Sequence, residues 1–511
     1  MIYIHSSGKY NDGIRHSFFG IFALLIFVTV ALAEGVRRLF HWSSETTRKI
    51  VHIFVGVLVA TTPFVLNSMW PMVILGILFA AIDFWAIRLG LFKGMHGTRR
   101  HTYGTVFYPI SFVILTVTLW EHHKLILVAS MLIMAISDAV AAIVGERVKR
   151  PTILKFGPEK KSLQGSAAMF ISTFLIVFVC CRVATDLQFY DIPMYKILWI
   201  AAIVAIIATL AEVISAQGSD NLSVPLSAAF TMFFMLTESS QEMIIFNLGL
   251  LLAILLAVIS FRLRFLDSGG AVALVLLGTL VFGVGKISFT LPILTFFILS
   301  SLLSKLGKQR KEILLTIFEK SGRRDAFQVL ANGGIPALSL LFWYFFKSDL
   351  FYLMYITSLA AVTADTWGTE IGVMAKGKTL SINNFRPVPK GTSGGISGLG
   401  TLGAALGAVV LTAVGYLFSP HSSPRVLSLQ DAAAIAIAGL LASFVDSYIG
   451  STIQAQFLCP VCGKQTEKRF HCDNRSTQFV HGYKWINNDV VNGFCALSGV
   501  LFILVYWFVR R

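Results

Sequence analysis

The N-terminal half of the chain contains a set of residues with the chemistry of a nucleotide-phosphate site. The set is Asp138, Lys160, Lys161, Ser162 and Gly165. On a helix, Asp138 shares one face with Ala142 and Gly145, so its carboxylate would lie beside small residues that allow a helix or a ligand to approach closely. A carboxylate near a membrane boundary can hold Mg²⁺, and two lysines beside a glycine-containing turn can receive phosphates. The alternative is that Asp138 only caps its helix or pairs with Arg147.

Two other polar segments of this half support the same prediction. They add Arg48, Lys49, His52, Asp220 and Asn221 to the candidate site residues. His52 and Asp138 are both candidates for taking the proton of an alcohol, although a single histidine near the end of a span is more often a hydrogen-bonded core residue. The loop at 218–225 contains no Lys or Arg, so it suits metal or hydroxyl binding better than phosphate binding alone.

The C-terminal half has a second set of polar residues inside or beside hydrophobic runs. This set comprises Arg323, Arg324, Asp325, Gln328, Asn332, Asp365 and Glu370. Arg324, Gln328 and Asn332 are spaced by four, and such a stripe entering a membrane span must face a cavity or a partner. Asp365 and Glu370 lie about one and a half helical turns apart, so they could share a metal ion or act in acid-base chemistry. The cation site of a transporter is the alternative interpretation of these two acids.

A glycine-rich turn at the expected start of another helix could bind an anion. Its candidate residues are Lys390, Gly391, Thr392 and Gly394. Main-chain N–H groups at a helix N-terminus bind phosphate and a lysine adds positive charge, while the alternative is a flexible hinge. Further polar residues in or at the start of later spans are Asp446, Asn488, Asp489 and Asn492. Acids and amides that recur this often in spans predict a shared polar cavity.

A polar loop near the C-terminus has the ligand spacing of a zinc site. Cys459 and Cys462 form one pair, and His471 and Cys472 form a second pair eight residues later. Four such ligands can surround a tetrahedral Zn²⁺, and a closed set of four predicts a structural site. His481 could replace His471 as the fourth ligand, and unpaired thiols in a reduced cytoplasmic loop are the alternative.

All of these residues need a membrane-embedded scaffold to bring them together. The chain of 511 residues is 56% hydrophobic and 13% charged, with a mean hydropathy of +0.75. A span needs about 20 apolar residues. Candidate spans begin near positions 17, 50, 70, 104, 124, 166, 195, 222, 243, 270, 288, 325, 350, 395, 430 and 489. We therefore expect an all-α, polytopic integral membrane protein with roughly 14 to 16 transmembrane helices, and no soluble fold.

Positive charge indicates the orientation of the spans. The net charge is +16, and most of the 42 Lys and Arg residues fall in every second loop. Because positive residues are retained on the cytoplasmic side, we expect the polar candidate residues to face the cytoplasm and both chain termini to lie outside. The same charge favours contact with anionic membrane lipids, whereas nucleic-acid binding is not expected.

The chain divides near residues 262 to 270 into two halves of similar size. No convincing internal repeat relates the halves, so we predict two different membrane domains, at 15–262 and 263–511, with the zinc loop at 457–488. A transporter built from two related bundles would need matching broken helices in both halves, and the sequence shows no such symmetry.

Residues 15 to 235 resemble the polyprenol kinases, which include dolichol kinase and phytol kinase. The similar segments are 48–52, 103–105, 108–109, 137–145, 160–165 and 220–221. The same half is also similar to the phosphatidate cytidylyltransferases, but Gln164 stands where those enzymes usually have Glu, which disfavours cytidylyl transfer. The resemblance to polyprenol kinases implies CTP as phosphoryl donor, Mg²⁺ as cofactor and a long isoprenoid alcohol as acceptor.

Residues 265 to 508 resemble the phytyl-phosphate kinase family, formerly classed as a domain of unknown function. The similar positions are Gly278, Gly283, Ser301, Lys305, 322–328, 365–370, 390–395, Asp446 and 488–492. The chemistry of that family does not require the cysteine loop, so zinc would be an accessory clamp.

Together the two resemblances imply a two-step kinase for isoprenoid salvage. The first half would phosphorylate an isoprenoid alcohol and the second would phosphorylate the monophosphate to a diphosphate. Mg²⁺ would be held by Asp138 or Asp220 in the first site, and by Asp365, Glu370 or Asp489 in the second. Phytol, geranylgeraniol and farnesol are all open as substrates, as is the oligomeric state. The alternatives are a transporter or scramblase of prenyl phosphates, or a fusion with one active kinase half.

Overall fold

The computed structural model describes most of the chain as long apolar helices. The described residues are 44–89, 102–157, 159–306, 323–374, 377–420, 427–472 and 475–510, with a few positions between 20 and 35. Within this part of the chain, ten helices are long and apolar enough to cross a membrane, and three shorter apolar helices accompany them. The prediction of an all-α polytopic membrane protein is confirmed, while the first expected span, near residue 17, falls largely outside the described residues.

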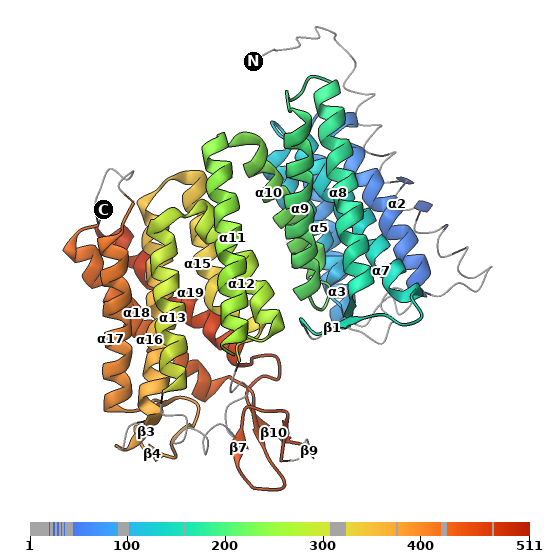
Figure 1. The fold of residues 1–511 in the computed structure, drawn as a ribbon. Coiled ribbons are helices and arrows are strands. Elements are labelled where there is room, and N and C mark those ends of the chain that lie inside the picture. The colour runs from blue at the N-terminus through green and yellow to red at the C-terminus, as the bar shows by residue number, and fades with distance from the viewer. Residues whose placement is uncertain are drawn as a thin grey trace. The chain divides into compact units, whose positions relative to one another are not determined.

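Contacts divide the chain into two compact units, Met1–Ser239 and Ser240–Arg511. In Figure 1 the helices of the first unit run from blue to green, and those of the second unit run from light green to red. The first unit contains α2 (Ser44–Val65), α3 (Trp70–Leu89), α5 (Gly104–Leu119), α6 (Lys124–Leu132), the π-helix η1 (Ile133–Ser137), α7 (Asp138–Arg147), α8 (Leu163–Asp186), α9 (Met194–Ile214) and α10 (Asp220–Thr237). Two short strands, β1 (Ile153–Leu154) and β2 (Lys161–Ser162), pair between α7 and α8.

The second unit contains eight long helices among its described residues. They are α11 (Ser240–Arg262), α12 (Ser268–Val284), α13 (Lys286–Lys305), α15 (Ala326–Phe346), α16 (Asp349–Met374), α17 (Gly398–Leu417), α18 (Leu429–Thr452) and α19 (Asn488–Arg510). Its loops carry short strands, β3 (Thr379–Ser381), β4 (Pro387–Val388), β5 (Gly395–Ile396), β6 (Gln456–Leu458), β7 (Gln465–Thr466), β8 (Phe470–His471), β9 (Arg475–Ser476) and β10 (Gln478–His481). The strands form small antiparallel sheets in the orders β4-β3-β5, β10-β6-β7 and β8-β9.

The boundary between the units differs from the one expected at residue 262. Helix α11 packs along α12 and therefore belongs to the second unit. At their crossing, a Cβ atom on Gly249 would lie 2.5 Å from the backbone nitrogen of Gly283. Paired glycines let two helix backbones meet in this way, and the contact outweighs the basic turn that marks the end of α11 in the sequence.

Helix α9 lies inside the first unit, packed by α8 on one side and α10 on another. Its buried residues include Ile197, Val204 and Ala208, and they cover all sides of the helix. A helix that is apolar all round is a buried helix. Glu212 lies in the last turn of α9, so this acid is held at the end of a buried apolar helix.

A continuous helical span from Lys124 to Arg147 contains a π-helical turn at Ile133–Ser137. The turn ends immediately before Asp138, which begins α7. Turns of this kind are rare, widen the helix and are frequent at functional sites. The backbone irregularity therefore coincides with the acid that the sequence analysis selected.

Small residues hold α7 against α8, as the sequence predicted. A Cβ atom on Gly145 would lie 2.9 Å from Ser162 Oγ, and one on Gly165 would lie 2.9 Å from the carbonyl oxygen of Ala141. Neither position has room for a larger side chain. The two helices thus carry Asp138 and the start of α8 close to one another.

Helix α16 lies inside the second unit and contacts α13, α15, α17, α18 and α19. It is buried without interruption from Tyr355 to Ala364, and Asp365 follows directly. Against α17 the approach is close, because a Cβ atom on Gly407 would lie 3.1 Å from the carbonyl oxygen of Thr363. The acids of α16 are thus carried by the most enclosed helix of this unit.

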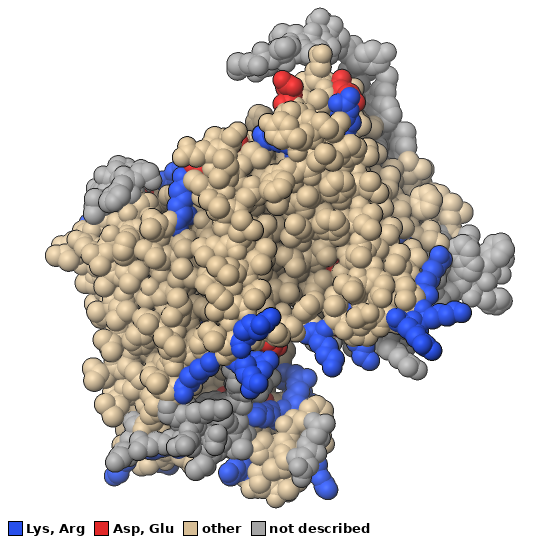
Figure 2. All heavy atoms as spheres, viewed as in Figure 1, with Lys and Arg blue, Asp and Glu red and all other residues tan. Residues whose placement is uncertain are grey.

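In each unit the loops that carry the predicted site residues also carry most of the charge. Figure 2 shows Lys and Arg concentrated at one end of each unit, and few on the apolar flanks. Exposed large hydrophobic residues such as Leu251, Leu402 and Val505 cover those flanks. This pattern is typical of helices in contact with lipid, with charged loops at the membrane surface.

Candidate functional site

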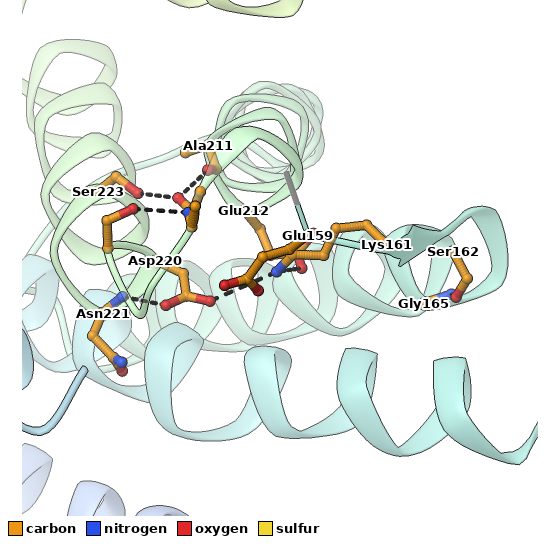
Figure 3. Close-up of polar contacts among 12 residues, drawn as sticks. Glu159, Lys161, Ser162, Gly165, Ala211, Glu212, Asp220, Asn221 and Ser223 are labelled. Atoms are coloured by element: carbon orange, nitrogen blue, oxygen red, sulfur yellow. Dashed lines mark hydrogen bonds and ion pairs between the residues drawn. The ribbon is translucent and has the colours of Figure 1, made fainter. Parts of the chain in front are cut away.

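Lys161 is the centre of the polar site in the first unit. Its Nζ atom lies 2.5 Å from Glu212 Oε1 and 3.7 Å from Asp220 Oδ2. Figure 3 shows the amine pointing toward these two carboxylates, with Glu159 beside them. The three residues come from β2, the end of α9 and the start of α10, so the site forms where these elements meet.

Electrostatics keep the Lys161 amine charged. Burial alone would lower the pKa of Lys161, but the carboxylates of Glu212, Asp220 and Asp138 raise it above its ordinary value. The influence of Asp138 places that acid near the same amine. Four carboxylates, counting Glu159, thus surround one lysine, and an excess of acids around a buried cation suits a divalent metal ion better than a bare phosphate.

The short strand β2 decides which lysine enters the site. Lys161 pairs with Leu154 of β1, and its side chain turns inward, while Lys160 is exposed. The next residue, Ser162, caps α8 by accepting a hydrogen bond from the Gly165 N–H at 3.1 Å. Ser162 and Gly165 therefore have a structural role at the helix start beside the site.

Several buried polar atoms near Asp138 have no hydrogen-bond partner among the described residues. They include Ser137 Oγ, Ser166 Oγ and Glu212 Oε2. Buried polar groups are almost always hydrogen-bonded, so each unsatisfied atom needs an explanation such as an ion, a water molecule or a ligand. These atoms mark the region between η1, α8 and α9 as a place where a polar ligand would be accommodated.

His52 and Lys49 of α2 have partners on the span that carries Asp138. His52 Nε2 lies 3.1 Å from the carbonyl oxygen of Met134, within the π-helical turn. A carbonyl oxygen only accepts, so Nε2 carries a proton and cannot itself act as a base. Lys49 Nζ donates to Glu146 Oε2 at 2.6 Å. The side chain of Arg48 lies outside the described residues.

The loop before α10 is tied to two other parts of the unit. The Gln217 N–H donates to Glu159 Oε1 at 2.8 Å, and the Gln217 carbonyl accepts from the Tyr103 N–H at 2.9 Å. Gly218 has φ +84°, and a Cβ atom there would lie 2.4 Å from the Gly104 nitrogen. This contact fixes the positions of Asp220 and Asn221, both predicted site residues, at the helix start.

The second unit contains a polar cavity of about 860 Å³ that gathers most of the predicted residues of this half. The predicted residues that line it are Arg323, Arg324, Gln328, Asn332, Asp365, Glu370, Lys390, Gly391, Thr392, Gly394, Asp446, Asn488 and Asn492. They come from loops and helices separated by up to 169 positions along the chain, from Arg323 to Asn492. The expected shared polar cavity is therefore present in this unit.

One wall of the cavity carries positive charge. Arg324 lies over the rings of Phe296 and Phe297, at 5.7 and 5.9 Å from their centroids. Lys305 donates to the carbonyl oxygen of Leu263 at 2.6 Å and lies 3.9 Å from the Phe265 ring. Aromatic faces hold these cations in fixed positions at the cavity wall, where they can meet phosphate oxygens.

The cavity is also lined by acidic side chains of α16 and α18. Asp365 and Asp446 both line the cavity, and their carboxyl groups lie close enough to interact. Asp446 Oδ2 is buried and has no hydrogen-bond partner among the described residues. Glu370 accepts a hydrogen bond of 2.6 Å from Ser304 Oγ. Carboxylate oxygens grouped beside fixed cations could hold a metal ion together with the phosphates that it binds.

The glycine-rich turn lines the cavity and has a left-handed backbone conformation that favours glycine. Gly394 has φ +75°, and a Cβ atom there would lie 2.3 Å from the Cβ of Ser451. Ser393 Oγ donates to Gln454 Oε1 at 3.0 Å, and Ser397 caps α17 by accepting from the Gly400 N–H. The turn is thus held against the end of α18, which argues against a freely flexible hinge.

Two predicted residues of this half are not among those that line the cavity. Asp325 caps α15, since its Oδ1 accepts from the Gln328 N–H at 2.9 Å. Asp489 is buried in the first turn of α19. Asp446, which the sequence analysis placed only among further polar residues, provides the acid beside Asp365 instead.

Some lining residues gave no clear signal in the sequence. They include Ser304, Ser443, Ser447, Gln454 and Glu467. Ser443 and Ser447 lie on α18 with Asp446, so a search at helical spacing from that acid would have found Ser443. Glu467 lies inside the cysteine loop, and nothing local in the sequence connects it with α18.

An apolar pocket of about 60 Å³ adjoins this cavity. Its walls are mostly apolar residues of α12, α13 and α15, such as Leu277, Leu294 and Val329. Arg324, Gln328 and Asn332 line both the pocket and the polar cavity. A charged side chain therefore stands where an apolar space meets a polar one, as an amphipathic ligand requires.

The four predicted zinc ligands lie together. The ligand atoms of Cys459, Cys462, His471 and Cys472 are all within 4.8 Å of one another. Backbone N–H groups of Cys462 and Val461 lower the pKa of the Cys459 thiol to about 6. A thiolate is the form that binds metal, so the loop has the donor set of a structural zinc site. Within this cluster the histidine is His471.

Comparisons with known proteins agree with the fold of an integral membrane protein. Residues 251–500 match the family described as "Integral membrane protein DUF92". Protein PGR from Arabidopsis thaliana is 31% identical over 273 residues, which are 50% of this chain and 92% of that protein. A phytol kinase from Synechocystis is 34% identical over 211 residues, or 41% of this chain and 88% of that protein.

A third relative is an uncharacterized membrane protein from Methanocaldococcus jannaschii, 32% identical over 183 residues, which are 35% of this chain and 74% of that protein. The helical fold and these matches define an integral membrane protein with polar sites at the ends of its spans. The chain belongs to the DUF92 family of integral membrane proteins, and its homologues include the phytol kinase and PGR. No solved structure matches it.

Proposed function

We propose that the protein is a membrane kinase that phosphorylates an isoprenoid alcohol, such as phytol or geranylgeraniol, to its monophosphate and then to its diphosphate. CTP would be the phosphoryl donor and Mg²⁺ the cofactor. The first unit would act on the alcohol and the second on the monophosphate. The observation that carries the proposal is the position of Arg324, at the junction of a polar cavity and an apolar pocket.

The apolar pocket supports a lipid substrate. A prenyl monophosphate has a charged head and an apolar chain, and the second unit offers a complementary surface for each. The head would meet Arg324, Arg323 and Lys305, and the chain would lie between α12, α13 and α15. The relative named phytol kinase supports the same class of substrate for the chain as a whole.

Phosphoryl transfer needs positioning and charge neutralisation more than covalent chemistry. Mg²⁺, when bound, would neutralise the oxygens of the donor phosphates. In the first unit Asp138, Glu212 and Asp220 have the oxygen ligands to hold it, and in the second unit Asp365, Asp446 and Glu370 do. Lys390 and the glycine-rich turn would contact donor phosphates in the second unit through the ammonium and backbone N–H groups.

The acceptors of the two steps differ in what they need. An alcohol must lose a proton, and Asp138 is a candidate base; with Nε2 donating to the Met134 carbonyl, His52 could take a proton only at Nδ1. A prenyl monophosphate is ionised and needs no base. This difference fits a first site with an excess of carboxylates and a second site with both cations and carboxylates.

Fusing the two units would benefit the pathway because the intermediate has an apolar tail. It stays in the bilayer, so a second site on the same chain sees it at a raised effective concentration. The role implied is salvage of a prenyl alcohol. The basic ends of the units would face the cytoplasm, where CTP is available.

The test is to incubate the purified protein in lipid with γ-labelled CTP, Mg²⁺ and phytol or geranylgeraniol, and to separate the lipid products. Label should appear first in the monophosphate and then in the diphosphate. Asp138→Asn should abolish the first product, and Asp365→Asn should stop the reaction at the monophosphate. Label in only one product with every alcohol would leave one active unit, and no labelled lipid with any nucleotide would overturn the kinase proposal in favour of transport.

A further inference from the structure

The cysteine loop of the second unit reaches the polar cavity. Glu467 lines that cavity, and its side chain is 8% exposed. It is close enough to Asp446 of α18 for their charges to interact. In the chain it lies between the two ligand pairs, five residues after Cys462 and four before His471. The loop thus contributes an acid to the same space as the acids of the membrane helices.

The cluster in this loop fits a tetrahedral metal ion. His471 Nδ1 lies 3.5 Å from Cys462 Sγ and 3.1 Å from Cys472 Sγ. Around a zinc ion with ordinary bond lengths, ligand atoms are about 3.5 to 4 Å apart. The Gly463 N–H donates to the Cys459 carbonyl at 2.9 Å, and Gly463 has φ +67°, so a tight turn holds the first pair.

The sheets of the cysteine loop, which carry the segment with Glu467, are small. Strands β6, β7 and β10 have three, two and four residues, and β8 and β9 have two each. Sheets this small are marginally stable without a packed face or a cross-link. A metal bound on both sides of the segment 463–470 would supply that cross-link, since the unfolded loop lacks the site and the free energy of metal binding therefore stabilises the folded loop.

We propose that Cys459, Cys462, His471 and Cys472 bind one structural Zn²⁺ and that this metal holds Glu467 beside Asp446 as part of the polar cavity. The cysteine loop then forms part of the cavity wall and contributes the carboxylate of Glu467 to the site. The zinc site and its effect on the loop stand apart from the proposed kinase activity. The contribution of Glu467 to turnover rests on that activity.

The first experiment measures the zinc content of the purified full-length protein by elemental mass spectrometry. The wild-type protein should contain about one zinc ion per chain. Cys462→Ser and Cys472→Ser should lose it. His481→Ala and Cys180→Ser, which change a histidine and a cysteine outside the cluster, should keep it. Zinc absent from the wild type, or retained in both ligand variants, would overturn the proposal.

The second experiment follows hydrogen–deuterium exchange in the same protein before and after chelation, without any substrate. Loss of zinc should raise exchange in 463–470 and in 443–452 of α18, while α9 in the first unit should be unaffected. Unchanged exchange in 463–470 after the metal has left would show that zinc does not position Glu467. Because no nucleotide is used, this result is independent of whether the protein is a kinase.

The third measurement tests Glu467 itself. Glu467→Gln should keep its zinc, lower conversion of the monophosphate by about tenfold and raise the Mg²⁺ concentration needed for half-maximal rate, with partial rescue by Glu467→Asp. If Glu467→Gln kept the wild-type rate and Mg²⁺ dependence while Asp446→Asn was inactive, Glu467 would have no role in the reaction. A wild-type protein with zinc and no kinase activity would instead count against the proposed function.

Discussion

Asp365 of α16 and Asp446 of α18 bring their carboxyl groups together at the wall of one polar cavity in the second unit. Two carboxylates that lie this close repel one another unless a positive charge is shared between them. A divalent cation bound by both groups would supply that charge. The pair therefore has the donor atoms of a metal site.

Removing either acid of this pair should stop the second phosphorylation. Asp365→Asn and Asp446→Asn each lose a charged ligand, and we expect the conversion of monophosphate to diphosphate to fall by about 100-fold or more, with the first step unchanged. Lipid products from γ-labelled CTP measure both steps. Glu242→Gln is the control, because Glu242 forms an exposed ion pair with Lys286 that should matter little. Diphosphate formed at the normal rate by both variants would contradict the assignment.

Lys161 and its neighbour Lys160 provide a matched test of the first unit. Lys161→Gln leaves Glu212 buried without its cation, so we expect the first phosphorylation to fall by about tenfold or more and the free energy of unfolding to fall by about 3 kcal/mol. Lys160→Gln changes an exposed side chain and should affect neither quantity. Product assays and unfolding in detergent measure the two effects. Equal effects of the two substitutions would refute the inward placement of Lys161.

The ion pair of Lys161 should also have a defined pH dependence. The neighbouring carboxylates raise the pKa of the Lys161 amine in the folded state above its ordinary value of 10.5. Such a group contributes its full stability below the unfolded pKa, and the contribution is lost as pH rises through the folded pKa. The difference in unfolding temperature between wild type and Lys161→Gln should be constant from about pH 6 to about pH 9 and shrink only above about pH 10.5. A difference that vanishes near neutral pH would be inconsistent with a charged lysine in the site.

The apolar pocket should set the preference for chain length. Val329→Phe narrows the space between α12, α13 and α15, so we expect KM to rise more for a geranylgeranyl or phytyl monophosphate than for a farnesyl monophosphate. Leu338→Phe, further along α15 and 51% exposed, is the control for a larger side chain on the same helix. Steady-state rates with the three monophosphates measure the ratio. An unchanged ratio in Val329→Phe would place the prenyl chain elsewhere.

Two glycines near the start of α17 test whether the turn requires glycine. Gly394 is crowded and has a positive φ, whereas Gly398 has free space around it. Gly394→Ala adds a Cβ atom 2.3 Å from Ser451 at φ +75°, so we expect loss of the second step and a loss of stability of about 2 kcal/mol. Gly398→Ala meets no atom within 4 Å and should be tolerated. Unfolding temperature and diphosphate yield distinguish the variants. Tolerance of both would mean that the turn adapts and does not shape the cavity.

The starts of the spans could be read from the sequence because hydrophobicity over about 20 residues is a local signal. The expected starts near 104, 124, 195 and 350 lie within one residue of α5, α6, α9 and α16. The assignment of α11 to the second unit could not be read in this way, because it depends on Gly249 meeting Gly283, and such a contact is not local.

The candidate site shows the same limit. Arg324, Gln328 and Asn332 were found because helical spacing puts them on one face. The partnership of Asp365 with Asp446, and the arrival of Glu467 from the cysteine loop, depend on how distant segments pack. Lys161 was distinguished from Lys160 only by the two-residue strand β2, which is too short to leave a pattern in the sequence.

The π-helical turn at Ile133–Ser137 sets the direction of everything that follows it on the same span. Each residue of a helix rotates the chain by about 100°, so a turn with one extra residue redirects every later side chain by that angle. If the same residues were wound as a regular helix throughout, the span would still cross the bilayer. Asp138 would then point toward a different neighbour, so one wide turn without any acidic or basic side chain sets the direction of this carboxylate.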